Sequence, residues 1–414
     1  MKLRKTLNYL LHPEGAAVLF ISMVWASQLV VYLQAVFLRI PILDSIADFI
    51  VPFLYVVVLF LSLPNLLKNF KVIDFVFYFS CLGIYLLNFI FYPRNIEVLN
   101  FYWVRFLILS LPLYFIGIAI DIKKMFNIFF IISILCVFWQ CFVSLIYKQA
   151  TIGSMVENEI AEQMHTSYNI LPHVLFVIWG TLRKFNIWGL IASVLGAFLI
   201  FSYGTRGPML CMLLFIIAYL ILFKQYKHRF LSWFLIIGVT AVLIYYLEVI
   251  VLFMQELTVN IGMSSRIFDI IVNQGLIQYT SGRDEIVSIL INAIRESGFL
   301  GYGIGGSWQF VNTYPHNLVI DLWISFGLFF GSLLFIVIIF IQLRGLKACK
   351  TLEDKGFLML LFFCGFFKLF MSYTYIDEPM LYMLLGFAVG LKRRKYQTER
   401  FPNLQNQIKK VVEL

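Results

Sequence analysis

His316 is the residue whose surroundings most suggest chemistry. It lies in the run Tyr-Pro-His-Asn at 314–317, directly before a long apolar segment. The positive end of the predicted helix tends to keep such an imidazole neutral near pH 7, and a neutral imidazole can take a proton from an attacking hydroxyl. A lone histidine is more often structural, so its interpretation as a general base depends on the charged residues expected around it.

Arg206 combines a forked donor with a predicted tight turn. It lies in the run Ser-Tyr-Gly-Thr-Arg-Gly-Pro at 202–208, where glycines on both sides allow the backbone to approach a ligand closely. A guanidinium beside free N–H groups at a helix N-terminus suits a phosphate. The alternative is an arginine that only reaches to the membrane interface, and the local features favour a functional role over it.

Arg283 stands near the start of a predicted amphipathic helix, in the run Ser-Gly-Arg-Asp-Glu at 281–285, with Ser281 as N-cap and Gly298 as its end. Apolar residues recur on one face of this helix: Ile286, Ile289, Leu290, Ala293 and Ile294. The helix dipole disfavours a positive side chain at this end, so a bound anion would explain Arg283. An ion pair with Asp284, Glu285 or Glu296 would explain it equally well.

Further polar residues are expected near the same face of the membrane: Arg105, Arg266, Asn317, Asp321 and Lys368. Arg105 and Lys368 fall in the outer parts of predicted spans, where a charge is costly and needs a reason. Asp321 could orient His316 or pair with either cation. Arg266 begins an amphipathic stretch that we interpret as a solvated surface.

These residues supply cations and one base but no cluster with metal-ligand spacing, so we expect no metal and no cofactor. Such a set fits a substrate that is anionic, embedded in lipid and presented on the outer face. A polyprenyl diphosphate carrying a sugar has these properties, and the cations would stabilise its diphosphate as it leaves. The six cysteines show no CxxC spacing and indicate neither a disulfide framework nor a zinc site.

The elements that must hold these residues are membrane-spanning helices. Of the 414 residues, 61% are hydrophobic and only 13% are charged, about half the charged share of a soluble domain. So little polar surface excludes a soluble enzyme or a nucleic-acid-binding protein. The sequence therefore predicts an all-α polytopic membrane protein.

Apolar windows bounded by charge, proline or glycine predict about 12 transmembrane helices, of which the sixth, eighth and twelfth are short. The windows are 15–38, 45–64, 72–92, 101–120, 126–147, 167–182, 185–203, 208–223, 230–254, 317–343, 356–375 and 378–391. The domains are then helices 1–9 in 1–254, a large extracytoplasmic loop with amphipathic helices in 255–316, helices 10–12 in 317–391, and a basic cytoplasmic tail in 392–414. The polar segment 148–166 is expected to be an outer loop.

Most of the 32 basic residues fall in alternate connections, which predicts cytoplasmic N- and C-termini and an active site on the outer face. The net charge of +10 is therefore mainly a topology signal. The run Gly-Phe-Leu-Gly-Tyr-Gly-Ile-Gly-Gly at 298–306 only superficially matches a dinucleotide signature, since no parallel strand precedes it. We interpret it as a flexible segment beside a substrate.

Four motifs occur in order: Thr-Arg-Gly-Pro, Ser-Gly-Arg at a helix start, Leu-Gly-Tyr-Gly-Ile-Gly, and Pro-His-Asn opening a span. Together they resemble the O-antigen polymerase and O-antigen ligase superfamily, over about 200–343. These polytopic glycosyltransferases of the GT-C type use undecaprenyl-diphosphate-linked glycans in the bacterial cytoplasmic (inner) membrane. Each motif is weak alone, and the ordered set is fairly specific.

The resemblance implies that Arg206 and Arg283 contact the diphosphate and that His316 activates the acceptor hydroxyl, in an inverting, metal-independent transfer. Arg266, Asn317 and Asp321 carry over less firmly. The expected partners are an undecaprenyl-diphosphate-linked oligosaccharide and the bilayer, together with a chain-length regulator and a flippase, and no nucleic acid.

The motifs favour a repeat-unit polymerase of the O-antigen or capsule type. The alternative is an O-antigen ligase that transfers the glycan to lipid A–core of lipopolysaccharide, or to protein. A polysaccharide flippase or transporter is less favoured, because the ionisable groups gather at one face only and no internal repeat is visible.

Overall fold

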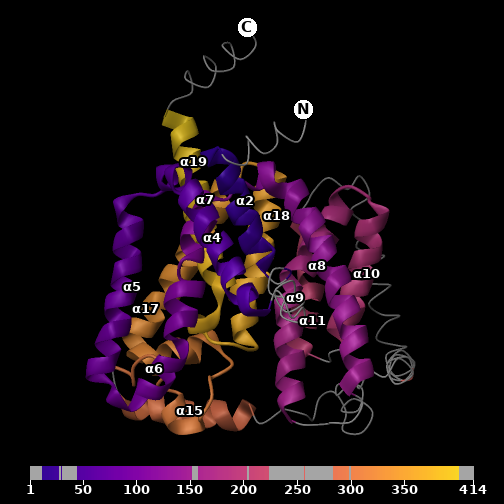
Figure 1. The fold of residues 1–414 in the computed structure, drawn as a ribbon. Helices are drawn as coiled ribbons and strands as arrows, with labels where there is room; N and C mark the ends of the chain where they lie inside the picture. The colour runs from indigo at the N-terminus through magenta and orange to yellow at the C-terminus, as the bar shows by residue number, and fades with distance from the viewer. Residues whose placement is uncertain are drawn as a thin grey trace. The chain divides into compact units, whose positions relative to one another are not determined.

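The computed structural model describes residues 12–27, 29, 44–151, 157–202, 205–222, 256, 283–297 and 300–400. These residues form helices joined by short connections, and no strand occurs among them (Figure 1). The chain divides into two compact units. Unit 1 contains Met1–Ile21, Val56–Met125 and Gly282–Leu414, and unit 2 contains Ser22–Tyr55 and Phe126–Ser281.

Within the described residues, five helices are long and apolar enough to cross a membrane: Pro52–Asn69, Val72–Phe91, Pro93–Ala119, Ile122–Ser144 and Leu318–Ala348. Their outer surfaces are apolar too. On α5 (Val72–Phe91), for example, Val72, Phe79 and Ile90 are 79%, 62% and 71% exposed. Water penalises such a surface along a whole helix and lipid does not. The chain is therefore an all-α membrane protein, as the composition predicts.

Several predicted spans coincide with helices. The window 72–92 matches α5, and the window 126–147 lies inside α8 (Ile122–Thr151). The windows 185–203 and 208–223 match α10 (Ile187–Ser202) and α11 (Arg206–Leu222). The first two windows overlap α2 (Pro13–Trp25) and α4 (Asp44–Leu66), and the ninth lies outside the described residues.

Helix α9 (Glu157–Arg183) corrects the prediction for the segment before the sixth span. It begins well before the expected start at 167, so the acidic end of the predicted outer loop 148–166 is helical. The sequence of this part contains three glutamates, and acidic residues favour the start of a helix because of the helix dipole.

The fourth predicted span is an interrupted helix. Its parts are α6 (Ile96–Trp103), the π-helical turn η3 (Val104–Ser110) and α7 (Leu113–Ala119). Pro112 stands between η3 and α7, where it supplies no backbone donor.

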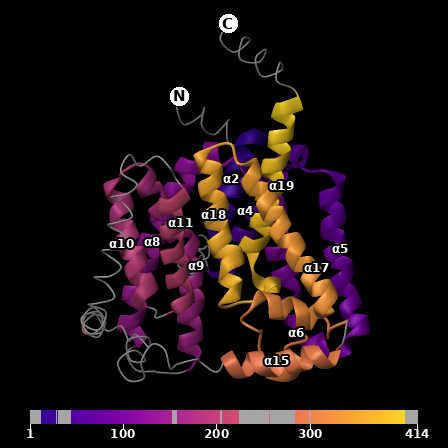
Figure 2. The ribbon, with the colours of Figure 1, turned by 180° about the vertical axis from the view of Figure 1, so that it is seen from behind.

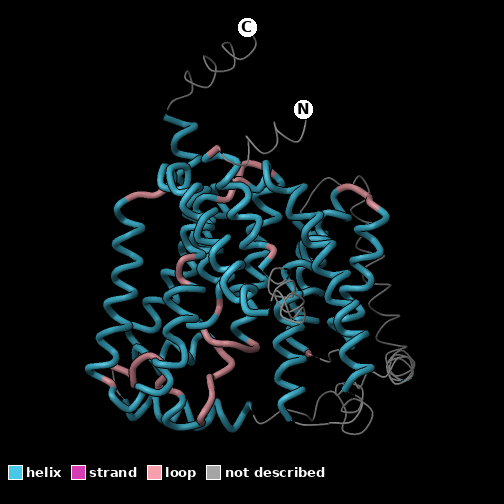
Figure 3. Tube along the Cα trace, in the orientation of Figure 1, coloured by secondary structure: helices cyan, strands magenta, loops and turns pink. Residues whose placement is uncertain are grey.

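The tenth and eleventh spans are interrupted as well. α17 (Leu318–Ala348) breaks at Gly327, whose φ is 77°. α18 (Leu352–Leu361) continues through a π-helical turn and a 3-10 turn as far as Phe370, and the short turn η6 (Tyr375–Asp377) leads into α19 (Pro379–Arg400). Irregular backbone at membrane depth is tolerated where protein or a polar cavity surrounds it, so these breaks mark the regions to inspect for function (Figure 3).

Small residues let α19 approach its neighbours in unit 1. A Cβ atom on Gly390 would lie 2.7 Å from the carbonyl oxygen of Ile118 on α7, and one on Gly386 would meet the carbonyl of Tyr114. On the α17 side, Gly345 lies against Ala388. This packing of small residues is typical of helices that associate within a membrane. Helix α19 continues past the predicted end of the last span at 391, as far as Arg400.

Helix α15 (Arg283–Ser297) lies across one end of unit 1, away from the end where α19 finishes (Figure 2). Leu290, Ala293 and Ile294 pack against Ile320 and Ile324 of α17. The predicted amphipathic helix is thereby confirmed. One assigned position is wrong, because Ile289 lies at the edge of the buried face and is 38% exposed.

Unit 2 has its own core, in which α9 packs against α10 and α11. An aromatic cluster fills part of this core, where the rings of Trp25 and Phe129 stack with centroids 4.8 Å apart. Ser133 Oγ accepts a hydrogen bond from Trp25 Nε1 at 3.0 Å and lies 3.3 Å from His173 Nδ1. His173 is buried in this cluster, which gives it a structural role.

Candidate functional site

The segment 371–374, which follows the interrupted eleventh span, connects the predicted site regions of unit 1. Arg283, at the start of α15, donates from Nη1 to the carbonyl oxygen of Met371 at 2.7 Å. Thr374 donates from Oγ1 to Asp321 Oδ2 of α17, also at 2.7 Å. Residues that are up to 88 positions apart in sequence therefore meet at one short segment.

Within the described residues, Arg283 forms no ion pair with a carboxylate. The bond to Met371 is the one hydrogen bond that its guanidinium makes within the described residues, and the ion pairs expected with Asp284, Glu285 or Glu296 are not formed there. A carbonyl oxygen orients one N–H group and leaves the positive charge unbalanced. The forked donor therefore keeps its capacity to bind an anion.

His316 occupies an unusual backbone position. Its φ is 57°, in the left-handed region that is costly for most side chains with a Cβ atom. The ring lies 4.3 Å from the ring of Tyr314, centroid to centroid, and Tyr314 in turn lies 6.4 Å from Tyr373. Nδ1 is buried and has no hydrogen-bond partner within the described part of the chain. Strain and an unused buried nitrogen at one residue are typical of a functional position.

The surroundings of His316 keep its imidazole neutral. Burial, and to a smaller extent the neighbouring Arg283 guanidinium, lower the pKa of His316 from 6.5 to about 4. The imidazole is therefore unprotonated at physiological pH, the state that a general base requires.

Asn317 and Asp321 have structural partners. Asn317 is the N-cap of α17, and its Oδ1 accepts from the backbone N–H groups of Val319 and Ile320 at 3.0 and 3.3 Å. Asp321 is buried and accepts from Thr374, so it contacts neither His316 nor the cations with which the sequence suggested it might pair.

Arg105 and Lys368 are each paired with a carboxylate that the sequence analysis did not select. Arg105 Nη1 lies 3.1 Å from Asp377 Oδ2. Lys368 forms an ion pair with Glu378, both side chains are buried, and its Nζ lies 3.9 Å from the ring centroid of Tyr373. Neither cation adds unbalanced positive charge, which distinguishes them from Arg283.

The glycine-rich segment is anchored rather than flexible. The side-chain amide of Asn95 donates to the carbonyl oxygens of Tyr302 and Ile304 at 2.8 and 3.0 Å. The backbone N–H of Ile304 donates to Asn88 Oδ1 at 2.7 Å. Gly303 has φ 82° and lies against the ring of Tyr92, so no side chain fits there. Its glycines serve close packing, not mobility.

The same segment donates hydrogen bonds to the carbonyl groups that the break in α17 leaves without helical partners. The backbone N–H groups of Tyr302 and Gly303 donate to the carbonyl oxygens of Ile324 and Ser325 at 2.7 and 3.0 Å. The break at Gly327 leaves these carbonyls without helical partners, and unpaired carbonyls inside a membrane protein are costly. The segment thereby fixes the first part of α17, which carries Asp321 and follows His316.

Of the two remaining predicted arginines, Arg206 belongs to unit 2 and Arg266 is not among the described residues. Arg206 is the first residue of α11 in unit 2. Thr205, directly before it, donates from Oγ1 to Ser167 Oγ at 2.5 Å, and the hydroxyl of Tyr168 occupies the space beside Gly207 that a ligand was expected to use. Arg266 lies outside the described residues.

Residues 371–378 contribute to the site although none of the four motifs contains them. Met371, Thr374, Asp377 and Glu378 supply partners for four of the selected residues. A signal was present, because the run Ser-Tyr-Thr-Tyr-Ile-Asp-Glu at 372–378 is polar where two apolar spans were expected to adjoin.

Unit 1 thus presents an arginine with an unbalanced charge, a neutral imidazole beside it, and a fixed backbone around both. Such a pair can bind an anionic group and accept a proton from a neighbouring hydroxyl. No family model, no curated protein and no solved structure matches this chain.

Proposed function

We propose that this protein is a glycosyltransferase that polymerises oligosaccharide repeat units. It would transfer a glycan from its lipid diphosphate to a sugar hydroxyl of a second lipid-linked unit, on the outer face of the bacterial cytoplasmic membrane. The transfer would be inverting and metal-independent, and both chain termini would be cytoplasmic.

The observation that carries the proposal is the unbalanced Arg283 guanidinium beside the neutral imidazole of His316. Both residues belong to the motifs that resemble the O-antigen polymerase and ligase superfamily. The motif residues Ser-Gly-Arg and Pro-His-Asn are separated by about thirty positions, and residues 371–374 and the core of α15 and α17 hold them in the same region of unit 1.

In the proposed reaction the acceptor hydroxyl oxygen attacks C1 of the donor sugar. The new glycosidic C–O bond forms as the C1–O bond to the diphosphate breaks, and the lipid diphosphate leaves with the electron pair. His316 takes the hydroxyl proton on its free imidazole nitrogen. Arg283 stabilises the negative charge that develops on the leaving diphosphate, which is the role that a metal ion plays in other transferases.

Substrate binding would also improve the base. A diphosphate beside Arg283 adds negative charge close to His316, and this charge raises the pKa of His316 from its value of about 4 in the free protein. The imidazole then becomes a stronger proton acceptor only when the donor is bound.

A ligase is the second candidate, because the same donor and the same groups serve a transfer to lipid A–core or to protein. The two activities differ in the acceptor alone. A transporter is less favoured, because no internal repeat of the kind that many transporters share is visible in the sequence.

The test is reconstitution of the purified protein in liposomes with a lipid-linked oligosaccharide and no other acceptor, read as a ladder on a gel. His316→Asn is the sharpest variant, since asparagine tolerates the left-handed backbone at this position and cannot act as the base. We expect a ladder from the unaltered protein and a loss of about 10² to 10⁴ in rate for His316→Asn.

Two results would decide against a polymerase. A normal ladder from a folded His316→Asn protein would remove His316 from the chemistry. No ladder from a cognate donor, followed by product once lipid A–core is added, would identify a ligase.

A further inference from the structure

A second cation-rich region lies at the end of unit 1 opposite α15. A cavity of about 490 Å³ opens there between the start of α5, the last turns of α17 and the second half of α19. Its walls are apolar, with Ile73, Phe340 and Val389 among the lining residues. Lys71, Arg344, Lys392 and Arg393 surround the same cavity, so it combines an apolar interior with positive charge.

Three of these cations have no carboxylate partner within the described residues. Lys71 and Lys392 are exposed and form no ion pair there. Arg344 places its guanidinium carbon 4.1 Å from the ring centroid of Phe340, one helical turn earlier, which holds the charge against the apolar wall. The cavity thus retains about three unbalanced positive charges.

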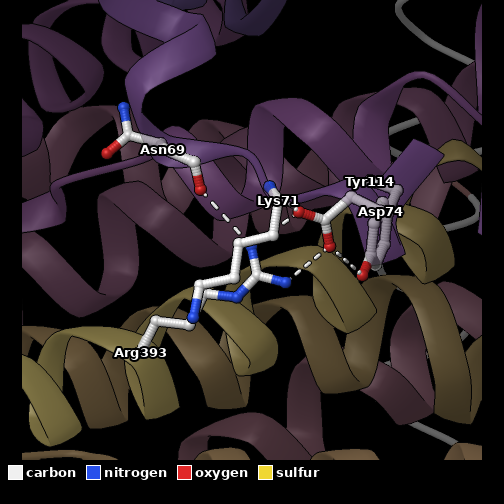
Figure 4. Close-up of polar contacts among 5 residues, drawn as sticks. All are labelled: Asn69, Lys71, Asp74, Tyr114 and Arg393. Carbon is white, nitrogen blue, oxygen red and sulfur yellow. Dashed lines mark hydrogen bonds and ion pairs between the residues drawn. The ribbon is translucent and has the colours of Figure 1, made fainter.

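The fourth cation, Arg393, links α19 to α5, two of the helices that line the cavity. It donates from Nη1 and Nη2 to both oxygens of Asp74, each at 2.6 Å, and from Nη1 to the carbonyl oxygen of Asn69 at 3.3 Å (Figure 4). Asp74 also accepts from the Tyr114 hydroxyl at 3.0 Å and from the backbone N–H of Lys71 at 2.7 Å. Every oxygen of this buried carboxylate is therefore used, so Asp74 does not neutralise the other cations.

The cavity lies at the ends of membrane-crossing helices. Lys71 directly precedes the apolar segment Val72–Phe91, and Arg344 lies in the last turns of Leu318–Ala348. At such a position the lining cations reach the headgroup region of a bilayer while the apolar walls border its hydrocarbon.

We propose that this cavity binds a phospholipid with an anionic headgroup, whose phosphate contacts Lys71, Arg344 and Lys392 and whose acyl chains lie along Ile73 and Phe340. Basic pockets between transmembrane helices are well suited to such lipids. The proposal is independent of the transferase reaction, because it concerns the opposite end of unit 1.

The test is native mass spectrometry of the full-length protein titrated with phosphatidylglycerol, phosphatidylcholine of the same acyl chains, or glycerol 3-phosphate. We expect phosphatidylglycerol to bind most tightly. The variant Lys71→Gln/Arg344→Gln/Lys392→Gln should bind it roughly 100-fold more weakly, since each basic residue near an anionic lipid surface strengthens binding by a factor of about five.

The matched control is Lys123→Gln/Lys124→Gln/Lys350→Gln, which removes the same charge from exposed lysines outside the cavity. It should keep most of the affinity. A second variant, Val389→Trp, fills the cavity without changing its charge and should also weaken phosphatidylglycerol binding.

Three outcomes would overturn the proposal: equal binding of the two phospholipids, equal losses in the cavity and control variants, or undiminished binding to Val389→Trp. Binding of glycerol 3-phosphate as tight as that of phosphatidylglycerol would overturn it too, in favour of a site for a free phosphate.

Discussion

Asp74 and His316, buried polar residues at the two ends of unit 1, differ in how their polar atoms are satisfied. At the α5–α19 end, Asp74 accepts two hydrogen bonds from Arg393, one from Tyr114 and one from a backbone N–H. At the α15 end, His316 Nδ1 and Ser372 Oγ are buried without hydrogen-bond partners among the described residues. A saturated network holds helices together, whereas unused buried groups are available to a ligand.

The two arginines make the same contrast. Arg393 has a bidentate carboxylate partner, and Arg283 has one backbone carbonyl. Removal of a partner therefore has different consequences at the two ends. Removal of a partner at the α5–α19 end should lower the stability of the protein, and removal of a group at the α15 end should lower its activity.

The largest effect is expected from Asp74→Asn, because it removes the buried carboxylate that pairs with the partly buried Arg393 guanidinium. Loss of one partner of such a pair costs about 3–5 kcal/mol. The free energy of unfolding in sodium dodecyl sulfate, followed by circular dichroism, measures this loss. Asp121→Asn is the matched control, since its pair with Lys124 is exposed at 3.9 Å and contributes no more than about 1 kcal/mol. Equal losses in both variants would contradict the structural role of Asp74.

Arg283→Ala should leave folding intact and reduce the transfer rate by about 10² to 10³, because a charged donor to the developing negative charge is removed. The polymerisation assay in liposomes measures the rate. Arg295→Ala provides the control, as this exposed arginine lies in the last turn of the same helix. A rate unchanged by Arg283→Ala would show that the unbalanced charge has no catalytic role.

Gly327→Ala tests the break in α17 that fixes the functional end. The backbone there, with φ 77° and ψ 169°, is accessible almost only to glycine, so we expect a loss of about 1–3 kcal/mol in stability. Gly83→Ala on α5 is the comparison, because a Cβ atom meets nothing within 4 Å and alanine favours the helix. An equal change in the free energy of unfolding for Gly327→Ala and Gly83→Ala would mean that the fold does not require the break at Gly327.

The pH profile gives the smallest expected effect and the sharpest comparison. The pKa of His316 is about 4 in the free protein, so kcat/KM should fall as the pH decreases towards 4 and the imidazole becomes protonated. A bound diphosphate raises this pKa, so the acid limb of kcat should lie at higher pH than that of kcat/KM.

Replacing Arg283 with Gln removes a nearby positive charge and should move the acid limb of kcat/KM to higher pH. Identical acid limbs in the two proteins would contradict the electrostatic effect of Arg283 on the pKa of His316.

Local sequence patterns predicted the regular elements well. The apolar length of α5 and the helical spacing of apolar residues in α15 are local properties that remain visible without neighbours. Asn317 was expected at the substrate site and not as a cap, although a residue of this type directly before an apolar run is also a local pattern, and it is the N-cap of α17. Patterns of this kind did not predict the helix breaks, because the backbone can depart from a helix within an apolar run without any change in the hydrophobicity of the sequence.

The partners of the charged residues could not be predicted in this way. Arg105 pairs with Asp377 and Arg393 pairs with Asp74, across 272 and 319 positions of sequence. A carboxylate within a few residues, such as those beside Arg283, is not the partner that the fold supplies. Long-range packing decides which cations are neutralised, and only then can a binding cation be distinguished from a structural one.

The sequence by itself determined that this is an all-α membrane protein, because its composition leaves too little polar surface for water, and it identified Arg283 and His316 from their positions at helix starts. The tertiary structure alone decided that these two residues lie together while Lys368 and Arg105 are neutralised. The physical reason is that burial and electrostatic pairing depend on distances in space, which the break in α17 and the segment 371–374 set between residues far apart in the chain.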